Sequence, residues 1–344
     1  VMGYLSQRHF NVEIELLVFS LTYDLEMDIS RRKFIYQTGA LAAGSCLVPS
    51  IALQSCNPAG RAGHVRMGFI GPEEHFRYYK PVLQKLRNTS VELISLDDAL
   101  NSDLHAIFIE SFPTIKATHI ILLLEKNKDI ITPYPLASSL SEYNRIQEFL
   151  DRHNRRLGML NPLYFYPSVI TLKEFLGGNN HELTKIRIYC HPDQLVKGYP
   201  INGATGTVAP LQRMISFVTG KFPYSLFIEE KTNEIRRWIL DYESFQATIQ
   251  VDPGQNGWIM EMDGPELKAL ADHTGLLSIN DEVKPRHSPA PHVWTTSMIK
   301  NFKDFLQAVR RRTEPMVNSL DGLSAIILHE AAVKTLHSGS KVNL

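Results

Sequence analysis

The segment Asp129–Ala137 constrains the fold more than any other part of the sequence. It reads DIITPYPLA, a short apolar run that ends at two prolines and small residues, shortly before Ser141 and Glu142. Such a run is typical of a buried strand that turns into a helix. In open α/β sheets, ligands bind outside the carboxyl ends of parallel strands, where these turns lie. We therefore predict that this turn presents Tyr134 as an exposed side chain at a binding site.

The length and composition indicate how many domains the chain can form and which class of partner it lacks. A chain of 344 residues is long enough for two domains. Thirty-six basic and thirty-six acidic residues give a formal net charge of zero. The sequence holds no basic tract longer than Arg310–Arg312, which we interpret as a solvated cluster near a helix end. The composition therefore argues against a nucleic-acid partner.

The N-terminal region reads as a targeting segment. Residues 1–26 show no clear periodicity, and we exclude them from the fold prediction. A twin-arginine pattern follows at Arg31 and Arg32, with Lys33 directly after it, and no charged residue then occurs until Arg61. A charged start followed by an apolar middle is what an export signal requires. We therefore predict an export signal over residues 27–56.

The end of this segment predicts how the exported protein is attached to the membrane. Leu53–Cys56 reads LQSC and resembles the lipobox of bacterial lipoproteins, where the cysteine is lipidated and becomes the mature N-terminus. Residues 57–63 would then be a tether, and the protein a periplasmic or envelope-anchored lipoprotein bound to the membrane through Cys56. The alternative is an uncleaved single-span anchor, which Pro49 and hydroxylated residues would weaken.

The folded body begins with a strand that runs into a glycine. Val65–Gly71 is apolar and ends as the first strand of a dinucleotide-binding fold should. If Gly71 takes the first glycine position of a pyrophosphate turn, Glu73 and Phe76 occupy the second and third. Glu73 and Glu74 also place two carboxylates at a helix N-terminus, where they would repel a diphosphate. The residues therefore predict a Rossmann-like turn without a bound nucleotide.

The segments that follow carry a resemblance to a known family. Asp129–Ala137, with Glu142–Pro167 after it, resembles the part of the glucose-fructose oxidoreductase and inositol dehydrogenase family where a strand ends in Glu-Lys-Pro-Leu-Ala. Tyr134 stands in the place of that lysine. The resemblance implies nicotinamide-dependent oxidation or reduction of a sugar or cyclitol. It also implies cofactor positions at Gly71, Glu73 and Pro113, the last closing a strand that is separated from the first by a shortened stretch of chain.

The second half predicts a sheet with helices. Strand-like segments alternate with Gly and Pro, and Asp252–Gly257 reads as a hairpin turn. The segment Gly203–Gly220 resembles the family's glycine-rich loop and catalytic helix. The places of the family's aspartate and histidine fall near Pro210 and Arg213, and neither residue can act as a general base at neutral pH. Later segments predict two amphipathic helices and a final strand. The strand-like and helical segments are Thr184–Cys190, Tyr224–Glu230, Phe245–Val251, Gly257–Met262, Ile299–Arg312 and Leu320–His337.

Two other features of the sequence bear on a ligand site. The histidines of the second half are scattered without metal-ligand spacing, so no metal site is predicted. The proline-rich segment Pro285–Trp294 either rims a sugar pocket or forms an ordered edge or subunit contact.

Together these patterns predict an α/β protein in two parts. A shortened Rossmann-like parallel-sheet domain over residues 64–162 precedes an α+β domain with an open antiparallel sheet over residues 163–344. The residues favour a non-catalytic protein that binds a carbohydrate or assembles as a homo-oligomer through the sheet, with no bound cofactor. The alternative is an active oxidoreductase that binds NAD or NADP and uses Tyr134 as proton donor, its pKa lowered by Arg213.

Overall fold

The computed structural model describes residues 63–110, 113–178, 182–191, 208–230, 236–284 and 292–344. These residues lie in one compact unit, Ala59–Leu344. The predicted export and lipidation residues, Arg31, Arg32 and Cys56, lie outside the described residues. Most of the proline-rich segment Pro285–Trp294 also lies outside them.

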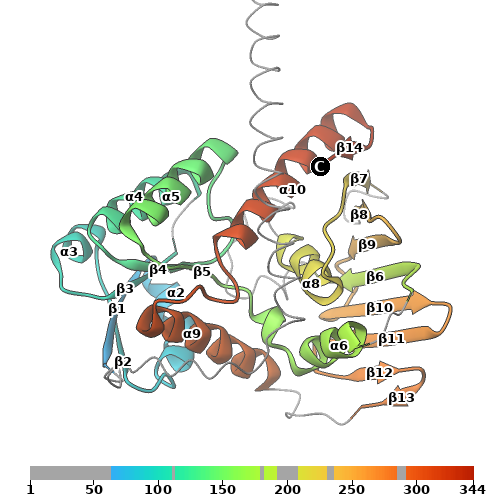
Figure 1. The fold of residues 1–344 in the computed structure, drawn as a ribbon, viewed down its shortest axis with the longest axis horizontal. Helices are drawn as coiled ribbons and strands as arrows, with labels where there is room; N and C mark the ends of the chain where they lie inside the picture. Colours follow the sequence, from blue (N-terminus) through green and yellow to red (C-terminus); the bar gives the residue numbers. More distant parts are fainter. Residues whose placement is uncertain (1–62, 111–112, 179–181, 192–207, 231–235, 285–291) are drawn as a thin grey trace, which may run out of the picture. The chain divides into compact units, whose positions relative to one another are not determined.

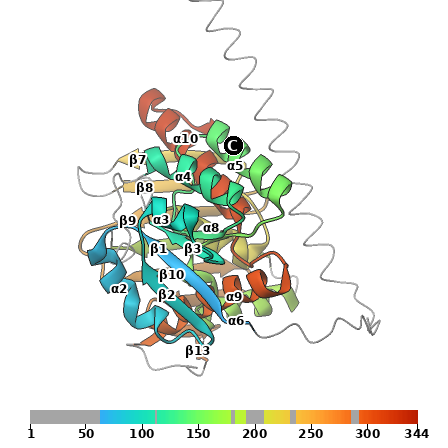
Figure 2. The same ribbon diagram turned by 90° about the vertical axis from the view of Figure 1, so that its left-hand side faces the viewer.

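The first half is built on a five-stranded parallel sheet with the order β2-β1-β3-β4-β5. Every neighbouring pair in it is parallel. Because β1 lies between β2 and β3, the chain reverses its direction of progress across the sheet at β1 and β3 (Figures 1 and 2). This is the topological switch point, where ligands of open α/β sheets bind. The strands are β1 (Val65–Ile70), β2 (Thr89–Leu93), β3 (Ala106–Ile109), β4 (Asp129–Thr132) and β5 (Leu157–Met159).

Helices cover both faces of this sheet (Figure 1). On one face, Phe69 and Phe108 pack with Tyr79 of α2 and Phe302 of α9. Gly158 of β5 leaves the space that the Phe305 ring of α9 fills, since a Cβ there would come within 2.8 Å of that ring. The helices of this half and α9 are α2 (Glu73–Leu83), α3 (Leu96–Asn101), α4 (Pro113–Glu125), α5 (Leu140–His153) and α9 (Val293–Arg311).

A short linker joins the halves. The 3₁₀ turn η1 (Pro162–Phe165) leads into α6 (Pro167–Gly178). Pro162 and Pro167 suit these starts because proline lacks the N–H that a helix N-terminus leaves unpaired.

The second half contains a nine-stranded sheet with the order β13-β12-β11-β10-β6-β9-β8-β7-β14. Its pairs are antiparallel except β6 with β9, which are parallel. The predicted hairpin at Asp252–Gly257 is therefore wrong, because β6 lies between the two strands that this turn connects. The strands are β6 (Lys185–Cys190), β7 (Ser225–Glu230), β8 (Arg236–Asp241), β9 (Gln246–Val251), β10 (Trp258–Gly264), β11 (Leu267–Asp272), β12 (Leu277–Ile279), β13 (Glu282–Val283) and β14 (Val342–Asn343).

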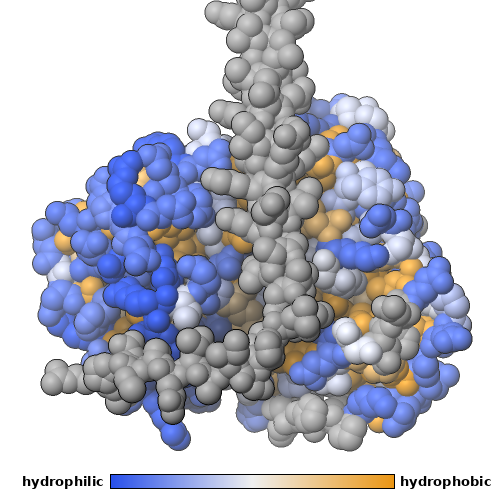
Figure 3. All heavy atoms as spheres, viewed as in Figure 1, coloured by the Kyte–Doolittle hydropathy of each residue, from blue (hydrophilic) through white to orange (hydrophobic). Residues whose placement is uncertain are grey.

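Helices α6, α8 (Ala209–Thr219) and α10 (Ser319–Ser338) lie on one side of this sheet (Figure 1). Along β6, β9 and β10, alternate residues are buried toward the helices and half-exposed on the other face. The half-exposed set mixes apolar and polar side chains, among them Tyr189, Thr248 and Ile259. Figure 3 shows apolar residues among polar ones over this half of the molecule. Among the described residues, the sheet therefore has one covered face and one open face, as predicted.

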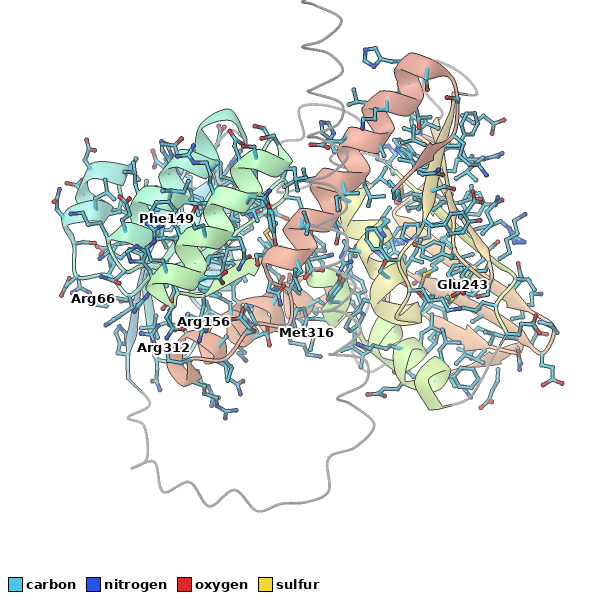
Figure 4. The ribbon with its side chains drawn as sticks, turned by 45° about the horizontal axis from the view of Figure 1, so that its top comes forward. Arg66, Phe149, Arg156, Glu243, Arg312 and Met316 are labelled. Carbon is cyan, nitrogen blue, oxygen red and sulfur yellow. The ribbon has the colours of Figure 1, made fainter. Side chains whose placement is uncertain are left out.

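The end of α9 is tied to the parallel sheet. The buried Asp129 carboxylate, at the start of β4, accepts from the Arg156 N–H at 2.9 Å and pairs with Arg312 Nη1 at 3.1 Å. Arg156 Nη2 donates in turn to the Arg312 carbonyl at 2.6 Å, and the two arginines lie close together in Figure 4. Arg312 is thus more than the solvated residue that the sequence suggested. Within the described part of the chain, no helix combines the length and apolar character needed to cross a membrane.

Candidate functional site

Tyr134 follows β4, as predicted, but its side chain is not exposed. Only 7% of it is accessible. The first turn of α10 packs on the same loop, because a Cβ at Gly322 would come within 2.6 Å of the Leu136 side chain. The loop after β4 is therefore closed by the start of α10, which the sequence prediction did not anticipate.

A buried polar cluster surrounds Tyr134. Arg213 of α8 donates from Nε and Nη2 to Asp321 Oδ1 of α10, at 2.8 and 2.7 Å. The Tyr164 hydroxyl donates to the same oxygen at 2.6 Å, and the other carboxylate oxygen accepts from the Asn318 N–H at 3.0 Å. We call Tyr134, Tyr164, Arg213 and Asp321 the Arg213 cluster. It lies where the family resemblance places the chemistry, and both charges in it are already paired.

The Arg213 cluster does not prepare Tyr134 to give up a proton. Burial raises the pKa of Tyr134 well above its usual value, and Asp321 adds to this rise. Arg213 acts in the opposite direction, but the net shift is upward, so the expected lowering of the Tyr134 pKa is wrong. Burial likewise raises the pKa of Tyr164 well above its ordinary value. Neither phenol is poised to exchange a proton near neutral pH.

Asn161 is the remaining polar residue next to this cluster. Its Nδ2 donates to the Pro210 carbonyl at 3.3 Å, and its N–H donates to Asn301 Oδ1 at 2.7 Å. It lies close enough to lower the pKa of Tyr134, although the Tyr134 hydroxyl has no partner within hydrogen-bond geometry. Pro210 thus contributes only a carbonyl acceptor, as a residue without a titratable side chain must.

The turn after β1 differs from a phosphate-binding turn. A Cβ at Gly71 would come within 2.7 Å of the Glu110 carbonyl and 2.9 Å of the Phe69 ring, so this glycine is required for packing within the chain. Glu73 begins α2, is exposed, and pairs with Arg77 at 2.7 Å. Pro113 is the first residue of α4. The three predicted cofactor positions therefore lie around the switch point, but their arrangement serves packing and surface pairing.

A second polar group lies at the switch point, and the sequence prediction missed it. Glu110 follows β3 and is 4% exposed, and its Oε1 lies 3.4 Å from His75 Nδ1 of α2. Lys116 of α4 is also buried and donates from Nζ to the carbonyls of Pro133 and Pro135, at 3.2 and 3.0 Å. We call His75, Glu110 and Lys116 the switch-point cluster. A charged residue directly after an apolar strand, as in Phe108-Ile109-Glu110, was the signal that could have revealed it.

Burial dominates the titration of this cluster. It raises the pKa of Glu110 to about 8, and the opposing effect of Lys116 is smaller. It lowers the pKa of Lys116 to about 8, against the effect of Glu110. Both oxygens of Glu110 and Nδ1 of His75 lack a hydrogen-bond partner. The switch point thus holds an acidic group where a dinucleotide would need donors for its phosphates.

No metal site emerges from these residues. In the described ranges, no three histidine, cysteine, aspartate or glutamate side chains are grouped so that they could hold a metal ion. Cys190, which the sequence left as the single cysteine of the folded body, is buried and free.

Comparison with known proteins finds no similar sequence but does find similar folds. No protein-family model and no curated protein sequence matches the chain. Solved structures do match it. An oxidoreductase from Agrobacterium radiobacter, in complex with NAD+, L-tartaric acid and magnesium, superposes with a TM-score of 0.69 at 12% identity, over 81% of this chain and 98% of that one.

The other matches point the same way. A scyllo-inositol dehydrogenase from Lactobacillus casei, with bound NAD(H) and scyllo-inositol, gives a TM-score of 0.67 at 14% identity, over 81% of this chain and 98% of that one. An aldose-aldose oxidoreductase from Caulobacter crescentus gives 0.69 at 12% identity, over 81% and 99%. The chain has the fold of the glucose-fructose oxidoreductase and inositol dehydrogenase family. The resemblance stated from the sequence is thereby confirmed at the level of fold, and the fold is one on which other proteins bind NAD.

Proposed function

We propose that this chain is a non-catalytic protein on an oxidoreductase fold, which binds a hydroxyl-bearing ligand such as a carbohydrate and assembles with copies of itself. The observation that carries this proposal is the Arg213–Asp321 ion pair. Oxidation of an alcohol needs a group that takes the alcohol proton. Here Arg213 is permanently protonated, Asp321 accepts from Arg213, Tyr164 and Asn318, and the neighbouring phenols keep their protons.

The residues at the switch point do not fit a dinucleotide. A pyrophosphate is held by backbone N–H groups at a glycine-rich turn and a helix N-terminus. In this chain the bare backbone of Gly71 lies against Glu110 and Phe69, Glu73 and Glu74 open α2, and Glu110 is buried beside them. The carboxylates of Glu73 and Glu74 disfavour an anion at the start of α2, so we derive no step that involves NAD or NADP.

The ligand class is inferred from the matched structures. Those proteins are described with scyllo-inositol, L-tartaric acid or glycerol, all of which carry hydroxyl groups. A protein that has kept the fold without the acid–base residues can retain affinity for such compounds without acting on them.

Fluorescence titration of the dialysed protein with NADH and NADPH tests this proposal. We expect no saturable binding, together with thermal stabilisation by neutral sugars or cyclitols in the absence of nucleotide. Saturable binding of either nucleotide at micromolar concentration would contradict it.

The second candidate is an active NAD(P)-dependent oxidoreductase. The observation that favours it is that two matched structures contain NAD and are covered almost completely by this chain. In this case Tyr134 would act as proton donor beside Arg213. Turnover of a sugar with NAD or NADP that is abolished by Tyr134→Phe would support this candidate and replace the first.

Assembly is proposed to use the open face of the nine-stranded sheet. The half-exposed side chains there include Tyr189, Ile259 and Leu270. Apolar side chains that gather on a surface favour contact with another protein. Light scattering coupled to gel filtration should give an oligomer that Ile259→Arg dissociates. A monomeric wild-type protein would contradict this part of the proposal.

Export and lipid anchoring are proposed from the sequence alone. Arg31 and Arg32 would direct transport, and Cys56 would carry the lipid. Labelling of cells with a radioactive fatty acid should mark the wild-type protein and not the Cys56→Ala variant. A cytoplasmic, unlabelled protein would contradict this localisation.

A further inference from the structure

The Glu110 carboxyl is the most unusual polar group among the described residues. It lies at the carboxyl end of β3, it is 4% exposed, and neither of its oxygens has a hydrogen-bond partner. Buried carboxyl groups are normally hydrogen-bonded, because an unmade bond leaves the full desolvation penalty in place. A group of this kind at a topological switch point is suited to accept hydrogen bonds from a ligand.

The residues around Glu110 provide further polar and aromatic groups. His75 Nδ1, also without a partner, lies 3.4 Å from Glu110 Oε1, and its side chain is 22% exposed. Tyr78, on the same helix, is 41% exposed and accepts from Trp294 Nε1 at 3.3 Å. Burial raises the pKa of Tyr78, and Glu110 adds a smaller rise, so the phenol lies within electrostatic reach of the carboxyl. The arrangement is therefore a buried acceptor next to His75, with Tyr78 about one turn further along α2 and Trp294 hydrogen-bonded to Tyr78.

The charges of the site select against anions. Glu73 and Glu74 lie at the exposed start of α2, and Glu74 lies 3.9 Å from His75 Nε2. Lys116, behind Glu110, is held by the carbonyls of Pro133 and Pro135 and compensates the buried carboxyl. A ligand with a negative charge meets the carboxylates of Glu73 and Glu74, whereas a neutral ligand with hydroxyl donors meets the unpaired oxygens of Glu110.

We propose that the switch-point cluster, with Tyr78 and Trp294, binds a neutral polyhydroxyl ligand, in which hydroxyl groups donate to Glu110 and a ring face packs against the aromatic side chains. This inference rests on the proposed function and gives its ligand a site in the nucleotide half of the fold. Aromatic faces and carboxylate acceptors suit sugars, whose rings have apolar faces and hydroxyl edges.

Three hexoses that differ in charge test the proposal on the full chain. D-galactose is neutral, D-galacturonate is an anion and D-galactosamine is a cation, and each is titrated by calorimetry, beside the neutral probes D-glucose, D-xylose and myo-inositol. We expect a neutral member of the set to bind. We expect D-galacturonate to bind at least about tenfold more weakly than D-galactose, because of the carboxyl groups around the site.

Variants locate the site. Glu110→Gln should weaken binding of the neutral ligand about tenfold, since an amide NH2 group, which cannot accept a hydrogen bond, replaces a carboxyl oxygen. The matched control is Glu243→Gln, on the exposed turn between β8 and β9 in the other half of the fold (Figure 4), and it should leave binding unchanged. Tyr78→Ala, at a partly exposed position on α2, should also weaken binding, and circular dichroism confirms that each variant is folded.

Each other outcome overturns the inference. Absence of binding by all four neutral compounds excludes a polyhydroxyl site, and preference for D-galacturonate excludes the charge argument. Neutral-sugar binding that Glu110→Gln leaves intact places the ligand elsewhere, in which case the proposed function survives and this site does not. Binding of NADH, by contrast, contradicts the proposed function itself.

Discussion

Arg213 and Asp321, which are more than a hundred positions apart in the sequence, form a buried ion pair that joins α8 to α10. Two guanidinium nitrogens share one carboxylate oxygen, at 2.8 and 2.7 Å, and Tyr164 donates to the same atom. The sequence resemblance placed Arg213 near a catalytic position of the family. In the structure the pair links the two helices, and both of its charges are paired.

Breaking this pair should destabilise the protein strongly. Asp321→Asn and Arg213→Met each leave a buried partner uncompensated, and we expect each to lower the free energy of unfolding by about 3–5 kcal/mol. The double variant should recover part of that loss, because no lone charge remains. Urea unfolding of the four proteins measures the coupling. Additive losses in the double variant would show that the two side chains are not coupled.

Two tyrosines of the Arg213 cluster should respond differently to loss of their hydroxyl groups. Tyr134→Phe removes a buried hydroxyl without a hydrogen-bond partner, so stability should stay the same or rise slightly. Tyr164→Phe removes the 2.6 Å bond to Asp321 and should lower the free energy of unfolding by about 1–3 kcal/mol. Thermal unfolding of both variants provides the comparison. Equal losses at the two positions would mean that Tyr134 has a partner.

Gly71 should be required for packing whether or not a nucleotide is present. Gly71→Ala places a Cβ 2.7 Å from the Glu110 carbonyl, and we expect a loss of about 1–3 kcal/mol in the free energy of unfolding. The control is Gly177→Ala, in α6, where an added Cβ meets nothing within 4 Å. That substitution should be neutral or stabilising. A neutral Gly71→Ala would remove the packing explanation for this glycine.

The Glu110 pKa predicts a pH dependence of stability. In the folded protein this pKa is raised from 4.5 to about 8 by burial, so the folded state holds a proton that the unfolded state releases. The stability that this group contributes is therefore present below pH 4.5 and is lost as pH rises toward about 8. Lys116, His75 and Tyr78 are the titratable groups that face or influence it.

The Glu110→Gln variant has no carboxyl proton to release, so its stability should not fall in this way as pH rises. The free energy of unfolding of Glu110→Gln, minus that of the wild type, should increase from pH 5 to about pH 8, by on the order of a few kcal/mol. Urea titrations at a series of pH values measure this difference. A difference that stays constant, or that falls as pH rises, would contradict the burial of an ionisable Glu110.

Local patterns were enough to predict the first half of the fold. The segment Asp129–Ala137 is a buried strand and turn because its apolar run stops at prolines, and this holds whatever packs around it. The same reasoning failed at Asp252–Gly257, where the residues favour a tight turn but the strands on either side pair with β6 between them. Turn chemistry is local, whereas strand pairing depends on residues far away in the sequence.

The candidate sites show the same limit. Tyr134 and Arg213 were chosen from the sequence, and the structure places them in one cluster with Asp321. The burial of Tyr134 could not be predicted, because it results from the start of α10. Along the chain, Glu110 and His75 are separated by the rest of α2, then β2, α3 and β3, and the parallel pairing of β1 with β3 brings them together.

The central claim is that no dinucleotide binds at the turn that contains Gly71. Crystals grown with a large excess of NADH test this most directly. We predict no nucleotide density at the turn between β1 and α2, with Glu110 still beside Gly71 and His75. Clear density for a pyrophosphate over Gly71, at the first N–H groups of α2, would contradict the account.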